Sequence, residues 1–249
     1  MSRLVTVVYS TGSQDYIDEA VSYLNQNSDK DINTIVIIDN GSEIPFVRDG
    51  CDDDNILIRL PENTGTNKVM PISLSAIQSF LKQNKRDPCE IIAFLHCDVF
   101  IQEKFWDRRV LDAFDSDPKL GLLGFVGSNE IDASGGRGTG TMLNFQGYTY
   151  KCCGQTSPAE SHGLRIDNLR PAAVLDHLAL IFRTDLLSDI VENDVPIHFY
   201  DRIVSCETLS RGQRVAVLGI KCDHAGDSRL QNKEQYNKLY KKWRRYWII

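Results

Sequence analysis

The sequence predicts an α/β fold in which a mostly parallel sheet is flanked by helices. Apolar runs of strand length alternate with segments of helical spacing through residues 5–100, as in sheets built from strand–helix–strand units. The runs at 35–38 and 91–95 are continuously apolar, which is typical of strands buried on both faces. Polar turns follow the first two strands, at 10–13 and 39–42.

Each element follows from its own pattern. Strands are expected over the apolar runs at 5–9, 34–38, 55–60, 91–98, 121–126 and 178–182. Helices are expected where apolar residues recur at helical spacing, at 15–25, 69–83 and 201–209. The segment 128–171 has no clear periodicity, and long irregular segments of compact domains tend to be functional or mobile. Because the chain shows no repeat and no low-complexity linker, a single domain is predicted over residues 1–228.

Composition narrows the class of protein. The chain has 249 residues, of which 42% are hydrophobic and 25% charged, as in ordinary soluble globular proteins. No apolar run approaches the roughly 20 residues that span a bilayer, and residues 1–8 lack the features of a secretory signal. The seven cysteines form no C-x-x-C pair, so we expect reduced thiols in a cytoplasmic protein. The net charge of −6 argues against a nucleic-acid partner.

The most informative stretch is the apolar run that ends in His96 and Asp98. Side chains two positions apart on a strand point to the same face. An imidazole and a carboxylate can therefore converge on one cation at the carboxyl edge, where open α/β sheets bind ligands. The alternative is a core strand followed by a polar turn.

Five short motifs follow one another along the chain. They are Val-Ile-Ile-Asp-Asn-Gly-Ser at 36–42, Glu-Asn-Thr-Gly at 62–65, Leu-His-Cys-Asp-Val at 95–99, His-Phe-Tyr-Asp at 198–201 and His-Ala-Gly-Asp-Ser at 224–228. In this order they resemble the inverting nucleotide-sugar glycosyltransferases of family two, which have the GT-A fold. Each motif is weak alone, but five in one order are more specific. The resemblance covers residues 4 to about 228 and implies a GT-A-like domain.

The resemblance implies a metal site for a nucleoside diphosphate leaving group. Asp98 matches the last carboxylate of an Asp-x-Asp-like metal motif, and His224 matches a late histidine that completes the metal shell in relatives. His96 replaces the usual first carboxylate, and it either ligates the ion or contacts the ribose or phosphate. Since imidazole suits Mn²⁺ better than Mg²⁺, Mn²⁺ is the expected cofactor and Mg²⁺ the alternative.

The resemblance also implies nucleotide-binding positions. Asp39 matches a carboxylate that accepts hydrogen bonds from the base or ribose. Its local alternative is a strand-end Asx turn, and both can hold at once. The further implied donor-binding residues are Tyr9, Thr11, Gly65, Asn67, His96 and Asp176.

Asp201 matches the family's general base, which an inverting displacement needs to deprotonate the acceptor hydroxyl. Its alternative is a helix N-cap or first-turn acid that stabilises the helix. Relatives often carry a second acid within three residues, but Arg202, Ile203 and Val204 follow here, so that part of the pattern is missing.

The expected function is metal-dependent, inverting transfer of a sugar, from a UDP-sugar first of all, to a hydroxyl of a glycan, protein or lipid. One alternative is a catalytically weak nucleotide-sugar-binding protein of the same fold, favoured by the irregular triplet at 96–98. Another is a sugar nucleotidylyltransferase, but residues 10–13 lack that class's glycine-rich loop. The glycine-rich stretch 135–140 lacks the strand and helix of a phosphate cradle, and we interpret it as a mobile loop over the donor.

The segment 229–249 is expected to form a C-terminal amphipathic helix. Its aromatic residues Tyr236, Tyr240, Trp243 and Trp247 share one helical face, and its basic residues lie largely off that face. The simplest interpretation is a helix that packs its aromatic face on the domain. The alternatives are peripheral contact with an anionic membrane surface and a cation that reaches the diphosphate.

Overall fold

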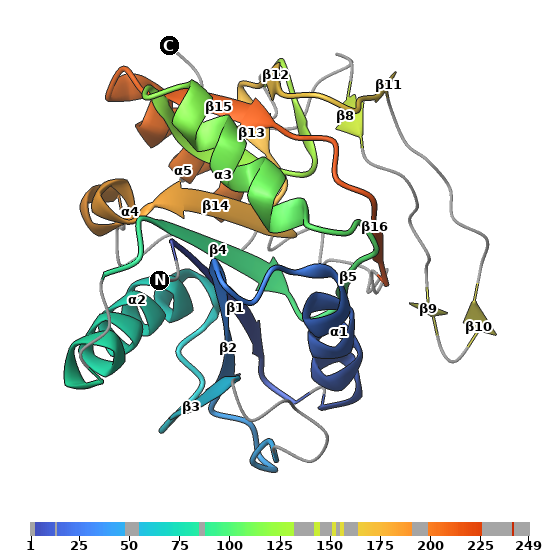
Figure 1. The fold of residues 1–249 in the computed structure, drawn as a ribbon, viewed down its shortest axis with the longest axis vertical. Coiled ribbons are helices and arrows are strands. Elements are labelled where there is room, and N and C mark those ends of the chain that lie inside the picture. The colour runs from blue at the N-terminus through green and yellow to red at the C-terminus, as the bar shows by residue number, and fades with distance from the viewer. Residues whose placement is uncertain are drawn as a thin grey trace.

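The structure, a computed structural model, describes residues 3–12, 14–47, 55–84, 88–131, 142–144, 151–152, 155–156, 164–190, 199–225 and 241. Eight strands form the central sheet in the order β12-β15-β6-β14-β4-β1-β2-β3 (Figure 1). They are β1 (Leu4–Ser10), β2 (Asn33–Asn40), β3 (Ile56–Leu60), β4 (Ile91–His96), β6 (Leu120–Gly124), β12 (Arg170–Pro171), β14 (Ala179–Arg183) and β15 (Arg214–Val217). The predicted α/β class with a mostly parallel sheet is confirmed.

Strands β1 to β4 run parallel to one another, and parallel strands are joined by crossover connections. Strand β14 runs antiparallel to both β4 and β6, and β15 runs parallel to β6. The carboxyl ends of β1, β2, β3 and β4 therefore share one edge of the sheet, and β14 begins at that same edge.

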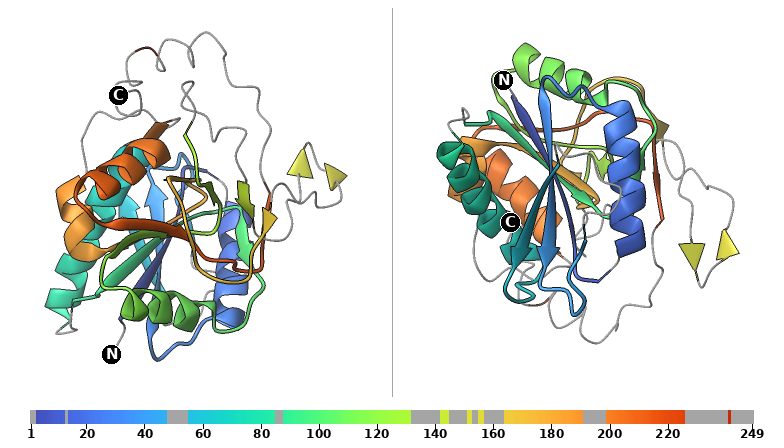
Figure 2. Two further views of the ribbon diagram at one scale, coloured as in Figure 1. Left: turned by 90° about the horizontal axis from the view of Figure 1, so that it is seen from above. Right: turned by 60° about the horizontal axis from the view of Figure 1, so that its bottom comes forward.

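Helices cover both faces of the sheet (Figure 2). Helices α1 (Gln14–Asn27) and α3 (Trp106–Ser116) pack on one face, and α2 (Thr66–Gln83), α4 (Thr184–Ile190) and α5 (Tyr200–Ser210) pack on the other. Alternate strand residues supply the two cores: Leu4 and Val8 of β1 face α1, and Val5 and Val7 face the opposite core. Both faces are thus buried, as the continuous apolar runs predict.

Short strands extend the structure beyond the main sheet. Strand β5 (Val99–Ile101) pairs antiparallel with β16 (Cys222–His224). A four-stranded sheet has the order β11-β8-β7-β13, with β7 (Gly127–Ser128), β8 (Met142–Asn144), β11 (Leu164–Arg165) and β13 (Val174–Leu175). A last pair is formed by β9 (Lys151–Cys152) and β10 (Gln155–Thr156).

Three differences from the sequence prediction stand out. The fourth strand ends at His96, and after a turn the chain begins the separate strand β5. The prediction also lacks α3, although its buried residues recur at helical spacing. The backbone N–H of Asp29 donates to Oδ2 of buried Asp107 at 2.7 Å, and Nε1 of Trp106 donates to Oγ of Ser28 at 3.0 Å. These contacts fasten α3 to the turn after α1.

The third difference concerns segment 128–171, which contributes β7 to β12 where no element was predicted. The glycine-rich stretch 135–140 and His198 lie outside the described residues, as does all of the predicted terminal helix except Lys241. Within the described ranges, no helix is both long enough and apolar enough to cross a bilayer.

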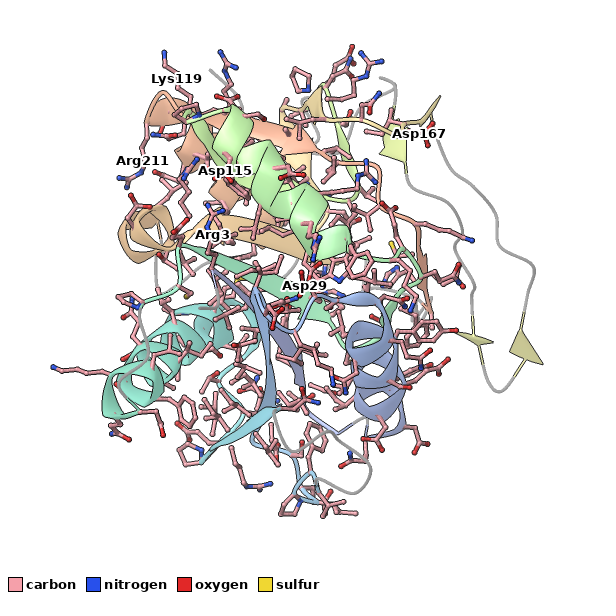
Figure 3. The ribbon with its side chains drawn as sticks, viewed as in Figure 1. Arg3, Asp29, Asp115, Lys119, Asp167 and Arg211 are labelled. Carbon is pink, nitrogen blue, oxygen red and sulfur yellow. The ribbon has the colours of Figure 1, made fainter. Side chains whose placement is uncertain are left out.

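An ion-pair group ties the amino-terminal edge of the sheet together. The guanidinium of Arg3, just before β1, donates to Glu90, just before β4, at 2.8 Å. It also donates to both carboxylate oxygens of Asp115 on α3, at 2.7 and 3.0 Å, and Figure 3 shows these two side chains side by side. Opposite charges thus join two strands and a helix at the edge away from the strands' carboxyl ends.

The turn after β2 requires glycine at position 41. Gly41 has φ +68, and a carbon added to it would lie 2.2 Å from the backbone carbon of Glu62. Gly212 also has a positive φ, +74, but its surroundings are open. We predict that Gly212→Ala costs about 1–2 kcal/mol of unfolding free energy through backbone strain alone. Gly41→Ala should cost about 1–3 kcal/mol more because the backbone must move.

Urea denaturation of both variants measures the difference. Equal losses for Gly41→Ala and Gly212→Ala would contradict the close approach of the turn to residue 62.

The same turn buries the carboxylate of Asp39, which is 1% exposed. Its oxygens accept the N–H groups of Ser42 at 2.8 Å and Phe46 at 3.1 Å, and Nη1 of Arg59 at 2.5 Å. Burial raises the pKa of Asp39. The hydrogen bonds from Ser42 and Phe46 and the charge of Arg59 lower this pKa by more than burial raises it, so the net shift is downward.

A carboxylate with a lowered pKa stabilises the fold above its unfolded pKa of about 3.9, and this stabilisation is lost as the pH falls through the folded value. Asp39→Asn should therefore be less stable than the wild type by about 1–3 kcal/mol at neutral pH. The difference should shrink below about pH 4. Denaturation curves at several pH values test this, and a pH-independent difference would contradict it.

Candidate metal and nucleotide site

The antiparallel pairing of β4 with β14 builds one side of the site. Leu95 is paired with Ala179, and the N–H of His96 donates to the carbonyl of Leu178 at 3.0 Å. The end of β4 consequently lies beside the residues that precede β14, among them Asp176 and His177.

A second pairing brings His224 to Asp98. Asp98 lies in the turn between β4 and β5, and β5 is paired with β16 so that His224 lies opposite Val99. The N–H of Ala225 donates to the carbonyl of Asp98 at 2.8 Å, which holds the two backbones together.

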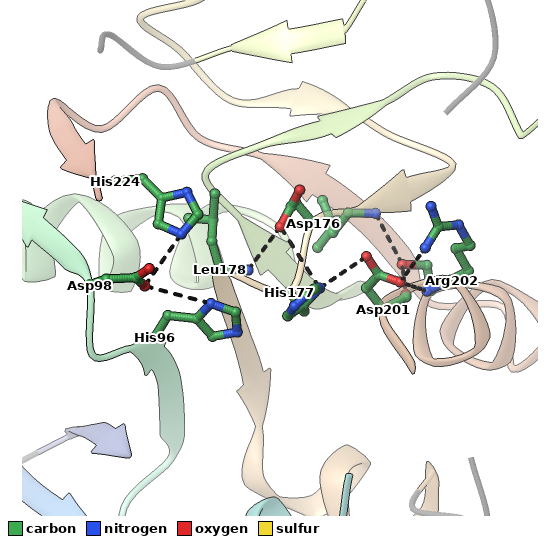
Figure 4. Close-up of polar contacts among 10 residues, drawn as sticks. His96, Asp98, Asp176, His177, Leu178, Asp201, Arg202 and His224 are labelled. Carbon is green, nitrogen blue, oxygen red and sulfur yellow. Dashed lines mark hydrogen bonds and ion pairs between the residues drawn. The ribbon is translucent and has the colours of Figure 1, made fainter. Parts of the chain in front are cut away.

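These contacts bring His96, Asp98 and His224 together (Figure 4). Nε2 of His224 lies 3.3 Å from Oδ1 of Asp98, and Nδ1 of His96 lies 3.8 Å from the same oxygen. One ligand atom from each side chain lies within 4.8 Å of the other two. His96 ends the strand while Asp98 follows in a turn, so the turn rather than strand alternation makes them converge.

The electrostatics of this group suit a cation. Burial, followed by the neighbouring His177, lowers the pKa of His96 to about 3, so its imidazole is neutral. Burial raises the pKa of Asp98, but the hydrogen bond and charge of His224 outweigh it and the net shift is downward. A carboxylate oxygen with imidazole nitrogens is a donor set that fits Mn²⁺ and suits Mg²⁺ less.

A second group of ligand-type residues adjoins the first: Asp176, His177 and Asp201. Nδ1 of His177 lies 3.4 Å from Oδ2 of Asp201 and 3.9 Å from Oδ1 of Asp176. The ring centroids of His177 and His96 are 4.5 Å apart. The sequence analysis missed His177, although its position next to Asp176 and before an apolar strand was a usable signal.

Asp201 lies in the first turn of α5, as predicted, and is 1% exposed. Its Oδ1 accepts the N–H of Arg202 at 2.8 Å and Nη1 of the same residue at 3.0 Å. Phe199 holds the N-cap position without a side-chain cap, so Asp201 is the first-turn acid of this helix.

The predicted nucleotide-binding residues lie along the carboxyl edge of β1, β2 and β3. Thr11 is exposed just after β1, and Gly65, with φ +76, is the N-cap of α2. Asn67 lies in the first turn of α2. Asp39 lies at this edge as well, but within the described chain its carboxylate is occupied by its own turn and Arg59.

Two buried tyrosines border the site. Tyr9 pairs in register with His96, and its ring meets the imidazole edge-on with centroids 5.9 Å apart. Among the described residues, the hydroxyls of Tyr9 and Tyr200 have no hydrogen-bond partner. Burial raises the pKa of Tyr9, and the charge of Cys97, Tyr200 and Asp98 raises it further. The sequence analysis missed Tyr200, because nothing in the sequence distinguishes it from an ordinary residue at the start of a helix.

Comparison of structures places this fold among GT-A glycosyltransferases. A mannosyltransferase of Pyrobaculum calidifontis, PcManGT, solved with GDP-Man and Mn²⁺, superposes with a TM-score of 0.62 at 14% identity, over 94% of this chain and 59% of that one. TarS residues 1–349 of S. aureus, solved with UDP, superpose with a TM-score of 0.54 at 16% identity, over 96% and 64%. This chain therefore spans less than two thirds of either structure.

Comparison of sequences gives a second finding. None of the curated proteins compared with this chain matches it. A family model described as "Glycosyltransferase like family" does match, over residues 72–243. That range contains both ligand groups, and it covers more than half of the sequence. The chain therefore belongs to the glycosyltransferase-like family.

Proposed function

We propose that this protein is a metal-dependent glycosyltransferase that moves a sugar from a nucleoside diphosphate donor to an acceptor hydroxyl with inversion. The observation that carries the proposal is the convergence of Asp98, His224 and His96 at the carboxyl edge of the sheet, where open α/β folds bind nucleotides. Family membership and the GT-A fold support the same reaction class.

Asp98 and His224, with His96 as third ligand, would hold Mn²⁺. A divalent cation there neutralises negative charge on the departing diphosphate. Inversion requires the acceptor to attack the anomeric carbon from the face opposite that leaving group. Asp201 and His177, on α5 and before β14, supply proton-accepting groups next to the metal group.

The remaining edge residues would bind the donor. Thr11 follows β1, Gly65 and Asn67 lie at the start of α2, and Asp39 shapes the turn after β2. We propose a UDP-sugar as the donor, because TarS, which has the same fold, was solved with UDP. The alternative donor is a GDP-sugar, because PcManGT was solved with GDP-Man.

The function is tested with a panel of UDP-, GDP- and dTDP-sugars. We expect release of nucleoside diphosphate from one donor class in Mn²⁺, slower release in Mg²⁺ and none with a chelator. Asp98→Ala should weaken Mn²⁺ binding about 100-fold or more, because a first ligand contributes at least as much as its supporting partners. Calorimetry measures the binding.

The matched control is Asp223→Asn. Asp223 precedes His224 in the chain, but its carboxylate accepts a hydrogen bond from the side chain of Gln102 and does not belong to the metal group. It should bind Mn²⁺ like the wild type. If Asp98→Ala binds Mn²⁺ as tightly as the wild type, the proposed metal site is wrong. Nucleotide binding without release from any donor would instead favour a binding protein.

The proton-accepting side is tested with Asp201→Asn. We expect donor hydrolysis or transfer to fall by about 10²–10⁴-fold, the usual contribution of general-base catalysis. Binding of UDP with Mn²⁺ should remain within about twofold, because Asp201 does not belong to the metal group. Asp112→Asn, on the exposed face of α3, is the control and should keep full activity. An active Asp201→Asn would show that this carboxylate is not needed.

A further inference from the structure

The carboxylate of Asp201 is poorly placed to meet an acceptor by itself. It is 1% exposed, and both of its oxygens already have partners. Two donors of Arg202 bind Oδ1, and Nδ1 of His177 lies by Oδ2. An incoming hydroxyl would have to displace one of these groups before it could reach the carboxylate.

His177 is the more accessible member of the pair. Its side chain is 28% exposed, against 1% for that of Asp201. Figure 4 shows it lying between His96 of the metal group and Asp201. A group between the cation site and the buried carboxylate is the first proton acceptor that a hydroxyl approaching the donor would meet.

The two carboxylates around His177 determine its tautomer. Nδ1 lies 3.4 Å from Asp201 and 3.9 Å from Asp176, and an ionised carboxylate only accepts hydrogen bonds. Nδ1 must therefore carry the hydrogen. A neutral imidazole with its hydrogen on Nδ1 has its lone pair on Nε2, which is then able to accept a proton.

The surroundings hold this arrangement in place. Oδ1 of Asp176 accepts the N–H of Leu178 at 3.0 Å, which fixes that carboxylate at the start of β14. Oγ of Ser205 donates to the carbonyl of Asp201 at 2.6 Å and accepts the N–H of Leu175 at 3.2 Å. The backbones that carry the imidazole and the carboxylate are thus linked by hydrogen bonds.

We propose that Nε2 of His177 accepts the proton of the attacking hydroxyl, and that Asp201 is a positioning residue that orients His177. This inference rests on the proposed function. The O–H bond breaks and its hydrogen moves to Nε2 as a proton, while the hydroxyl oxygen forms a bond to the anomeric carbon. The bond from that carbon to the diphosphate oxygen breaks, and the nucleoside diphosphate leaves with the electron pair.

A pair of variants separates proton acceptance from hydrogen bonding. His177→Asn keeps an N–H donor close to the position of Nδ1, so it can still bind Asp201, but it lacks Nε2. His177→Ala lacks both nitrogens. With the best donor of the panel and water as acceptor, we expect both variants to lose about 10²–10⁴-fold in kcat. KM for the donor and calorimetric binding of UDP with Mn²⁺ should stay near wild type.

Rescue by asparagine would overturn the proposal. If His177→Asn keeps kcat within about threefold of wild type while His177→Ala loses it, the role of the residue is to hold Asp201, and Asp201 itself is the base. A wild type that binds Mn²⁺ but releases no diphosphate from any donor would instead overturn the proposed function, and with it this inference.

A third measurement needs no donor. Long-range ¹H–¹⁵N spectra of the labelled protein at pH 8.5 report which nitrogen of His177 carries the hydrogen, with His177→Asn used to assign the signal. We expect Nδ1–H in the wild type and Nε2–H in Asp201→Asn, whose amide can donate to Nδ1. Nε2–H in the wild type would overturn the inference while leaving the proposed function intact.

Discussion

The antiparallel pairing of β14 with β4 is the constraint on which the site depends. Strand β4 ends at the carboxyl edge of a parallel sheet, and an antiparallel neighbour must begin at that same edge. His96 and His177, distant in the chain, consequently stand with their rings 4.5 Å apart. A parallel β14 would have ended rather than begun there, and Asp176 and His177 would lie at the opposite edge.

A second constraint is charge compensation in a partly buried site. Three carboxylates and three imidazoles gather there from β4, the turn after it, the start of β14, α5 and β16. A buried carboxylate is costly unless it is paired or hydrogen-bonded. Asp98 has His224, Asp201 has Arg202 and His177, and Asp176 has the N–H of Leu178. The same pairings hold these side chains close to one another.

The early part of the chain could be predicted because its signals are local. Each of β1 to β4 is at least five residues long and contains four or more apolar residues, and such a pattern can be recognised without knowledge of the partner strand. Strands β7 to β13 are only two or three residues long, too short for any periodicity to show. Helix α3 was missed although Trp106, Val110 and Phe114 recur at helical spacing, so that error lay in the interpretation.

The sequence by itself determined the residue types available to the site, their order, and which of them follow a buried strand. The strand that ends near Asp98 made this residue a candidate ligand, and the family resemblance added His224 and Asp201 as candidates. The tertiary structure decided which side chains meet, namely His224 with Asp98 through β5 and β16, and His177 with Asp201 through β14 and α5. The physical reason is that these contacts depend on strand pairing and helix packing between distant segments, and no local pattern of residues specifies that pairing.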